Sequence, residues 1–117
     1  MQQGTSIAAG CIADVEVMDT DRYLSSVNAP EFIEDVSLCI ESGARFMIIN
    51  CAALSFLTGA GLRAFLVLAR KMYAVDGVLQ IRGLKRQPRR FFFACGMDSI
   101  IPLVKEETRF PAARVRA

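Results

Sequence analysis

Histidine and tryptophan are both absent from the 117 residues of this chain. Histidine is the side chain best suited to transferring protons near neutral pH, and it supplies the base of most nucleophilic triads. No other set of acid, base and nucleophile can be recognised in the sequence. An enzyme is therefore the least favoured class of function.

Long hydrophobic runs are also missing, although 53% of the residues are hydrophobic. Charges or glycines interrupt every apolar stretch before it reaches the roughly 18 residues that a membrane-spanning helix needs. The first residues, MQQGTSIAAGCIADVE, lack the basic start and apolar stretch of a signal peptide. We therefore expect one soluble, cytoplasmic domain that does not bind membranes.

Cysteine is scarce, and its four positions lie far apart in the chain. Without histidine they form no recognisable zinc-binding spacing. Free thiols buried as small hydrophobic side chains are the simplest interpretation. The sequence predicts neither a metal site nor a cofactor. The cysteines are Cys11, Cys39, Cys51 and Cys95.

Acidic and basic residues are divided unevenly along the chain, although the net charge is only +2. Residues 1–58 hold eight acidic and two basic residues, a balance of −6, whereas residues 59–117 hold twelve basic and four acidic residues, a balance of +8. Because a folded domain interleaves its halves, we expect the imbalance to average out over the surface. A charge dipole that survived folding would steer a charged partner.

The first half of the chain predicts a strand, a helix and a second strand. Residues 11–18 alternate in polarity and favour a strand with one face on a core. Asn28 is a typical N-cap, with Pro30 in the first turn and Glu31 placed for a capping box, and Gly43 ends the helix. Residues 45–54, RFMIINCAAL, predict a central strand covered on both sides. The core face of the helix consists of Phe32, Val36, Cys39 and Ile40.

A glycine turn, TGAG, opens the clearest helix of the chain. Arg63, Arg70 and Lys71 occupy the side opposite its apolar stripe, Gly77 closes the helix, and residues 78–83 predict another strand. The apolar stripe consists of Leu62, Phe65, Leu66, Ala69, Met72 and Tyr73.

The last part of the chain predicts a helix from near Pro88 to Gly96 and then a short strand over residues 99–103. The proline in SIIPL favours the edge of a sheet for this strand. Residues 105–117 have no periodic pattern and predict a flexible tail. Strands alternating with helices indicate an α/β domain over residues 11–104, with a mixed sheet of four to five strands.

Residues 11–104 resemble the STAS domain, the family of bacterial anti-sigma factor antagonists. Asn28-Ala29-Pro30 is similar to the start of that family's first helix, and MIINCAAL to its buried LVLDLS strand. FLTGAGL is similar to its F-I-D-S-S-G-L turn, with Phe56, Gly61 and Leu62 matching. The segment VLQIRGLKRQPRRFFFACGMDSIIPL follows the family's order of strand, proline-started helix and short terminal strand.

The chain departs from the family at the positions of the family's phosphoacceptor and acidic residues. The resemblance implies that the phosphoacceptor is one of two adjacent hydroxyl residues in the turn, which are here Gly59 and Ala60. Acidic positions of the family are occupied here by Thr58, Asn50 and Ser25. In the family, a phosphate added at this helix start spoils the surface that binds the kinase. That reaction cannot occur on a glycine or an alanine.

The resemblance implies a non-enzymatic protein that binds an anti-sigma factor or a related serine kinase without the serine phosphoswitch. Thr58 and Ser55 remain as candidate phosphoacceptors, but a helix N-cap is the preferred interpretation of Thr58. The bare N–H groups at the turn could hold an anion, although a tight turn without a ligand is preferred. The implied partner-binding residues are Ser25, Asn28, Asn50, Thr58, Gly59, Ala60, Gly61 and Arg63.

A basic cluster precedes and begins the third predicted helix. Cations are unfavourable in the first turn of a helix, so helix propensity does not explain Arg89 and Arg90. An ordinary solvated face and a docking patch for an acidic or phosphate-bearing partner are both open, whereas no aromatic or reading-helix motif favours nucleic acid. Other classes also remain: a scaffold module without a phosphoswitch, either homo-oligomeric or part of a larger sensory or signalling assembly, and a domain that binds a small anion or lipid. The cluster is Lys85, Arg86, Arg89 and Arg90.

Overall fold

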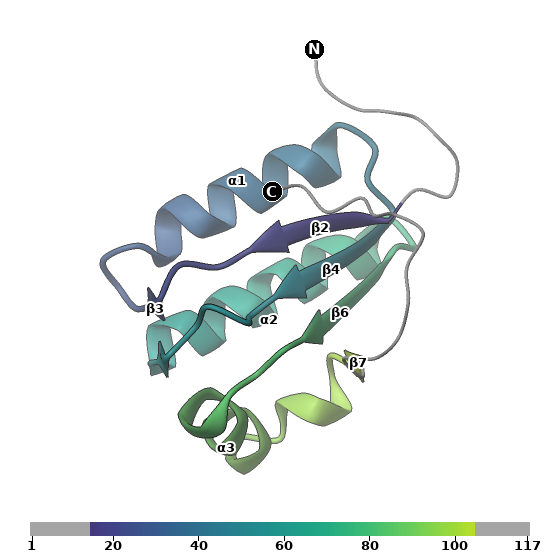
Figure 1. Cartoon of the computed structure of the whole chain (residues 1–117). Helices are drawn as coiled ribbons and strands as arrows, with labels where there is room; N and C mark the ends of the chain where they lie inside the picture. Colours follow the sequence, from purple (N-terminus) through teal and green to yellow (C-terminus); the bar gives the residue numbers. More distant parts are fainter. Residues whose placement is uncertain (1–14, 105–117) are drawn as a thin grey trace.

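The computed structural model of the chain describes residues 15–104, which form an α/β domain (Figure 1). The elements, in chain order, are β2 (Glu16–Asp19), β3 (Tyr23–Leu24), α1 (Ala29–Glu41), β4 (Phe46–Asn50), β5 (Phe56–Leu57), α2 (Gly59–Ala74), β6 (Val78–Arg82), α3 (Arg86–Ala94), the 3₁₀ helix η1 (Met97–Ser99) and β7 (Leu103–Val104). Within this range no helix is long and apolar enough to cross a membrane.

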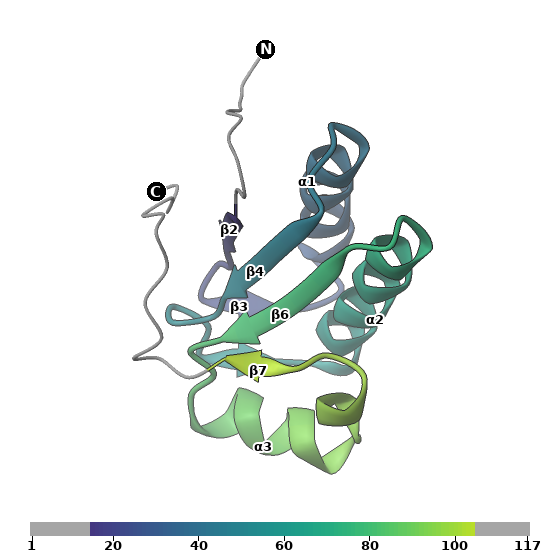
Figure 2. The ribbon, with the colours of Figure 1, turned by 90° about the vertical axis from the view of Figure 1, so that its right-hand side faces the viewer.

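The main sheet has the strand order β2-β4-β6-β7, and each neighbouring pair is parallel. A helix connects each strand to the next, and such crossovers produce parallel neighbours. The predicted α/β class is confirmed. The predicted mixed sheet would also need an antiparallel pair of strands, whereas every strand pair within residues 15–104 is parallel. Figure 2 shows α1 and α2 side by side against the sheet, with α3 below them near β7.

The core is centred on β4, as predicted for a covered central strand. Met47, Ile48 and Ile49 are all 0% exposed, and β2 and β6 flank them. Phe65 of α2 makes edge-to-face contacts with Phe32 of α1 and Phe92 of α3 at centroid distances of 6.3 and 6.4 Å. One aromatic ring therefore contacts a residue of each of the other two helices.

The start of α1 is confirmed, but its predicted cap is wrong. Asn28 occupies the N-cap position without a side-chain bond to the helix. Its Oδ1 accepts the N–H of Ser25 at 2.9 Å, and its Nδ2 donates to the carbonyl of Tyr23 at 2.8 Å. The side chain holds the preceding loop, so the capping box with Glu31 does not form. Gly43, with φ +111°, ends the helix as predicted.

The end of α2 differs from the prediction in its mechanism. Asp76 takes the left-handed conformation, with φ 60°, whereas Gly77 does not. A Cβ on Gly77 would lie 2.8 Å from the sulfur of Met72 and 3.0 Å from the carbonyl of Arg45. Gly77 is therefore required for close packing and not for a left-handed turn. Tyr73, assigned to the buried stripe, is 46% exposed.

The last elements follow the predicted order with shifted bounds. The helix begins at Arg86, two residues before Pro88, and Gly96 follows it with φ 74°. Residues 99–103 were expected to form the final strand, but Ser99 belongs to η1 and the strand begins at Leu103. Its edge position is confirmed. The predictions for residues 11–14 and for the tail 105–117 lie outside the described residues.

Candidate functional site

Two very short strands bring the loop before α1 beside the turn before α2. Tyr23 pairs with Phe56, and Leu24 with Leu57, in a parallel two-stranded ribbon. The carbonyl of Leu24 also accepts the N–H of Thr58 at 3.1 Å. Residues 25–28 therefore lie next to residues 58–61, as a shared binding surface requires.

Thr58 is the N-cap of α2, as preferred from the sequence. Its Oγ1 accepts the N–H of Gly61 at 3.3 Å, and its hydroxyl donates to the carbonyl of Leu24 at 3.0 Å. The hydroxyl is thus used both as acceptor and as donor. Ser55 is exposed and directly precedes β5, where its N–H donates to the carbonyl of Arg22 at 2.7 Å.

The two glycines of the turn have different surroundings. A Cβ on Gly61 would lie 2.6 Å from the carbonyl oxygen of Leu24 and 2.8 Å from the side chain of Leu57. A Cβ on Gly59 would meet nothing within 4 Å. Gly61 is therefore a packing requirement, whereas Gly59 leaves open space at the helix start.

Exposed apolar side chains lie beside this turn, and the sequence analysis missed them. Tyr23 is 46% exposed and its strand partner Phe56 is 53% exposed, while Val27 in the adjoining loop is 79% exposed. Phe56 stands out in the sequence only as a match to the family's turn, and a two-residue strand is too short to show a period that would mark Tyr23 or the exposure of either side chain. We call the following set the turn surface: Tyr23, Ser25, Val27, Asn28, Phe56, Thr58, Gly59, Ala60, Gly61 and Arg63.

Two of the predicted partner-binding residues lie beyond the turn itself, and only the first belongs to the turn surface. Arg63 is exposed on α2, one turn beyond Gly59. Asn50 lies at the end of β4, and its Nδ2 donates to Asp19 of β2 at 2.9 Å. Its Oδ1 accepts the N–H of Ala52 at 3.4 Å, and neither Asp19 nor Ala52 belongs to the turn surface.

Acidic side chains gather at a groove between the end of β2 and the start of α1. The amide of Asn28 donates to a carboxylate oxygen of Asp21 at 3.3 Å inside this groove. The expected averaging of charge over the surface is therefore wrong, because folding places acidic residues of the first half of the chain together. The groove is lined by Asp19, Asp21, Leu24, Asn28, Glu31, Phe32 and Asp35.

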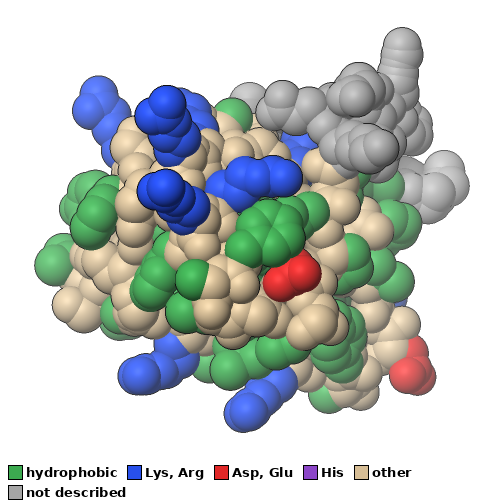
Figure 3. Space-filling view, turned by 90° about the horizontal axis from the view of Figure 1, so that it is seen from below, with side chains coloured by type: hydrophobic (Ala, Val, Ile, Leu, Met, Phe, Trp, Pro, Cys, Tyr) green, Lys and Arg blue, Asp and Glu red, His purple; other side chains and the backbone are tan. Residues whose placement is uncertain are grey.

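The predicted basic cluster is exposed on α3 and on the residue before it. Arg86, Arg89 and Arg90 line a shallow hollow with Phe93, and the guanidinium of Arg89 lies 5.1 Å from the centre of the Phe93 ring. Lys85 is exposed at the N-cap position and makes no side-chain cap bond. Figure 3, seen from the α3 side, shows Lys and Arg side chains gathered over this face around exposed hydrophobic ones.

A glutamine of α3 connects that helix to β5, directly before the turn. The side chain of Gln87 accepts the N–H of Leu57 at 2.9 Å through Oε1 and donates to the carbonyl of Leu57 at 3.0 Å through Nε2. The amide thus pairs with β5 in the way a neighbouring strand would. The sequence does not predict this contact, because a glutamine in a helix gives no indication of a partner that is distant in the chain.

The sequence and the fold agree with a known family. The STAS domain family matches residues 7–109 of this chain. The chain belongs to the STAS domain family. BtrV of Bordetella bronchiseptica, whose name places it with the anti-sigma factor antagonists, is 28% identical to this STAS domain over 90 residues, covering 77% of this chain and 78% of BtrV.

Solved structures show the same fold. The anti-sigma factor antagonist SpoIIAA in its unphosphorylated form matches this STAS domain with a TM-score of 0.70 at 20% identity, over 85% of this chain and 87% of that one. An anti-sigma factor antagonist from Mycobacterium paratuberculosis matches with a TM-score of 0.71 at 20% identity, over 80% of each chain. At such identities the likeness shows the fold.

Proposed function

We propose that this STAS domain is an anti-sigma factor antagonist that binds an anti-sigma factor of the serine-kinase type through the turn surface. Its function is binding and not catalysis. The relatives named above are anti-sigma factor antagonists by name, which supports a protein partner of this kind. Because residues 58–61 include no serine, binding is not switched off by serine phosphorylation of the turn.

The observation that carries the proposal is the exposed apolar patch beside the turn. Tyr23, Val27 and Phe56 present large hydrophobic side chains to solvent on segments that adjoin Thr58. Aromatic residues are enriched at the centres of protein interfaces, and clustered exposed apolar side chains mark binding surfaces. The carbonyl of Leu24 accepts both the N–H and the hydroxyl of Thr58, which holds the patch against the start of α2.

Insensitivity to phosphorylation follows from the side chains in the turn. Gly59 and Ala60 offer no hydroxyl, and the hydroxyl of Thr58 already makes two hydrogen bonds. Phosphorylating Thr58 would remove the hydroxyl hydrogen and so break its donation to the carbonyl of Leu24. The bound state should therefore persist while the kinase holds ATP.

Calorimetry with purified anti-sigma factor kinases from the same host tests the binding surface. We expect association with one of them at tens of micromolar or tighter, and Phe56→Ala should weaken it at least about tenfold, as for an interface anchor. Phe46→Ala is the matched control, because Phe46 is also exposed but begins β4, outside the turn surface. Equal weakening by both changes, or no binding to any such kinase, would contradict the proposal.

Intact-mass measurement after treatment with kinase and ATP tests the missing phosphoswitch. The wild-type mass should stay unchanged, whereas the triple variant Thr58→Asp, Gly59→Ser, Ala60→Ser should gain about 80 Da, one phosphoryl group. The open space around Gly59 accommodates the added serine. A phosphorylated wild type would contradict the proposal that the chain lacks a phosphoswitch. An unmodified triple variant would contradict the assignment of residues 59 and 60 as the acceptor positions.

A further inference from the structure

Two helices of this domain carry charge of a single sign. The sequence of α1, APEFIEDVSLCIE, contains four acidic residues and no base. The sequence of α3, RQPRRFFFA, contains three arginines and no acid, and Lys85 precedes it. The acidic surface is Glu31, Glu34, Asp35 and Glu41, and the basic surface is Lys85, Arg86, Arg89 and Arg90; all eight side chains are exposed.

These charges are locally unfavourable within each helix. Glu31 and Asp35 are four residues apart, as are Arg86 and Arg90, and like charges at this spacing repel. Arg86 and Arg89 also stand in the first turn of α3, where the helix dipole disfavours cations. The dipole of α1 favours only Glu31, which stands in its first turn. Helix stability therefore does not account for either surface as a whole, and an opposite charge from outside would relieve the repulsion in both.

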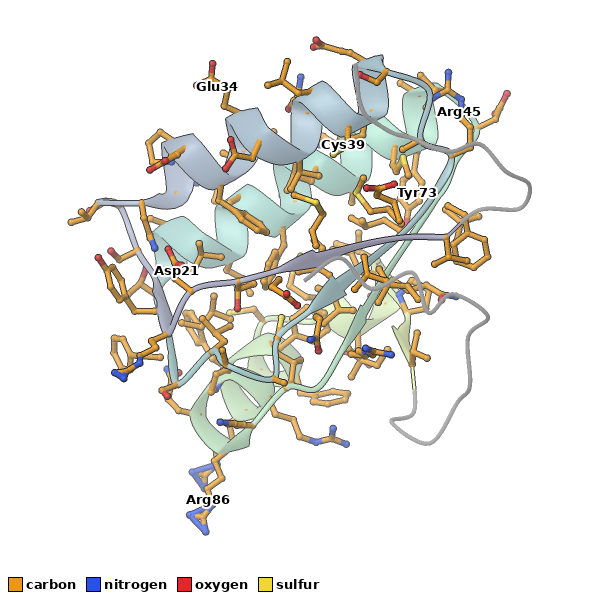
Figure 4. All side chains as sticks on the ribbon, turned by 45° about the horizontal axis from the view of Figure 1, so that its top comes forward. Asp21, Glu34, Cys39, Arg45, Tyr73 and Arg86 are labelled. Carbon is orange, nitrogen blue, oxygen red and sulfur yellow. The ribbon has the colours of Figure 1, made fainter. Side chains whose placement is uncertain are left out.

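The two surfaces lie on opposite sides of the molecule. Figures 1 and 2 show α1 at the top and α3 at the bottom in both views. Figure 4 shows the labelled Glu34 and Arg86 pointing away from the domain at opposite ends. The surfaces of one copy therefore cannot neutralise each other, but each remains accessible to another molecule.

Each charged surface also contains one large exposed apolar side chain. Leu38, 56% exposed, follows Glu34 by one helical turn on α1, and Phe93, 41% exposed, lines the hollow with Arg86, Arg89 and Arg90 on α3. An apolar centre within a charged rim is the usual anatomy of a protein interface. The two surfaces match in number of charges, in opposite sign and in this arrangement.

We propose that the partner of each surface is a second copy of this chain. The acidic surface of one copy docks on the basic surface of the next, with Leu38 facing Phe93. Because the two surfaces lie on opposite sides, every added copy leaves one of each free, and the contact repeats head to tail. Exposed ion pairs are individually weak, so the assembly is concentration-dependent and sensitive to salt.

Sedimentation velocity of the full chain tests this contact. At low ionic strength the mean mass should rise with concentration above the 12.9 kDa of one chain and past that of two copies, and about 0.5 M salt should return it to one. A mass that stays at one copy at low salt, or levels off at two, overturns head-to-tail assembly.

Charge reversal identifies the surface. Arg86→Glu with Arg90→Glu should leave a monomer without harming the fold, because a glutamate in the first turn of α3 suits the helix dipole. The matched control is Arg70→Glu with Lys71→Glu, which changes the net charge equally at exposed positions of α2. Association that survives the α3 reversal, or that the control abolishes equally, overturns the assigned surface.

Mixing two reversed proteins provides a gain-of-association test. Glu34→Lys with Asp35→Lys should also be monomeric alone, whereas an equal mixture with the α3-reversed protein should associate again, because opposite charges then face each other. A mixture that stays monomeric overturns the proposal. None of these measurements involves a kinase, so their outcome is independent of the proposed function.

Discussion

At the scale of single residues, the two glycines of the turn predict opposite effects of the same substitution. Gly61→Ala should destabilise the domain by about 1–3 kcal/mol, because the new Cβ would collide with the main chain at Leu24. Gly59→Ala should stabilise it by about 0.4–1 kcal/mol, because the position is helical and open and the unfolded chain loses freedom. Urea unfolding of both variants measures the free energies, and equal effects would contradict the described turn.

The cysteines also differ residue by residue. Burial raises the pKa of the Cys51 thiol from 9.0 to about 12, whereas Cys95 is exposed. In the folded protein, iodoacetamide at pH 8 should modify Cys95 and leave Cys51 unmodified, because the thiolate is the reactive form. Peptide mapping by mass spectrometry distinguishes the two sites, and labelling of Cys51 in the native protein would show that it is accessible.

The raised pKa of Cys51 also predicts that the stability of the domain depends on pH in the alkaline range. Folding favours the protonated thiol of Cys51, so its contribution is complete below about pH 9 and is lost as the pH rises toward 12. Cys51→Ala should therefore lose less free energy of unfolding than the wild type over this window. Urea titrations at several pH values give the two slopes, and parallel slopes would contradict burial as the cause.

At the scale of secondary-structure elements, the amide of Gln87 is the connection between α3 and β5. Gln87→Ala should cost about 1–3 kcal/mol, because it leaves the N–H and carbonyl of Leu57 without these partners. Gln87→Glu keeps an acceptor for the N–H but loses the donor, so its free energy of unfolding should fall between those of the wild type and Gln87→Ala. Hydrogen exchange at the Leu57 amide should speed up most in the alanine variant; unchanged exchange would mean that the contact is not maintained in solution.

The order and type of the larger elements could be predicted because local rules and tertiary packing agree there. The apolar stripe and the Thr58 cap of α2, and the continuous apolar run of β4, each point to the structure that forms. The cap of α1 was mispredicted because Asn28 has stronger partners in Tyr23 and Ser25 than in the helix. The N-cap preference of asparagine does not predict which of several possible hydrogen bonds its side chain makes.

The candidate site was predicted less completely than the fold. The turn at residues 58–61 carries local signals, whereas the exposed pair of Tyr23 and Phe56 exists only because two residue pairs distant in sequence align as β3 and β5. Asn50 illustrates the reverse, since its side chain bonds to Asp19 of β2 and not to a residue of the turn surface. Surface composition depends on tertiary contacts that a single sequence does not encode locally.

At the scale of the whole molecule, Phe65 is the ring on which the three helices converge. Phe65→Ala should destabilise the domain by about 3–5 kcal/mol, because it opens a cavity and removes the contacts with Phe32 and Phe92. Chemical unfolding followed by circular dichroism measures the loss, with the exposed Phe46→Ala as a control expected to cost much less. A small loss at Phe65 would mean that the helices pack independently.

The order of the strands has a consequence for how the domain is assembled during synthesis. Along the described sheet, β2, β4, β6 and β7 succeed one another in space as they do in the chain. Each new strand is therefore added to an existing edge, and none is inserted between strands that have already paired. A chain that emerges from the ribosome N-terminus first can complete both neighbours of β4 before α3 and β7 have been made.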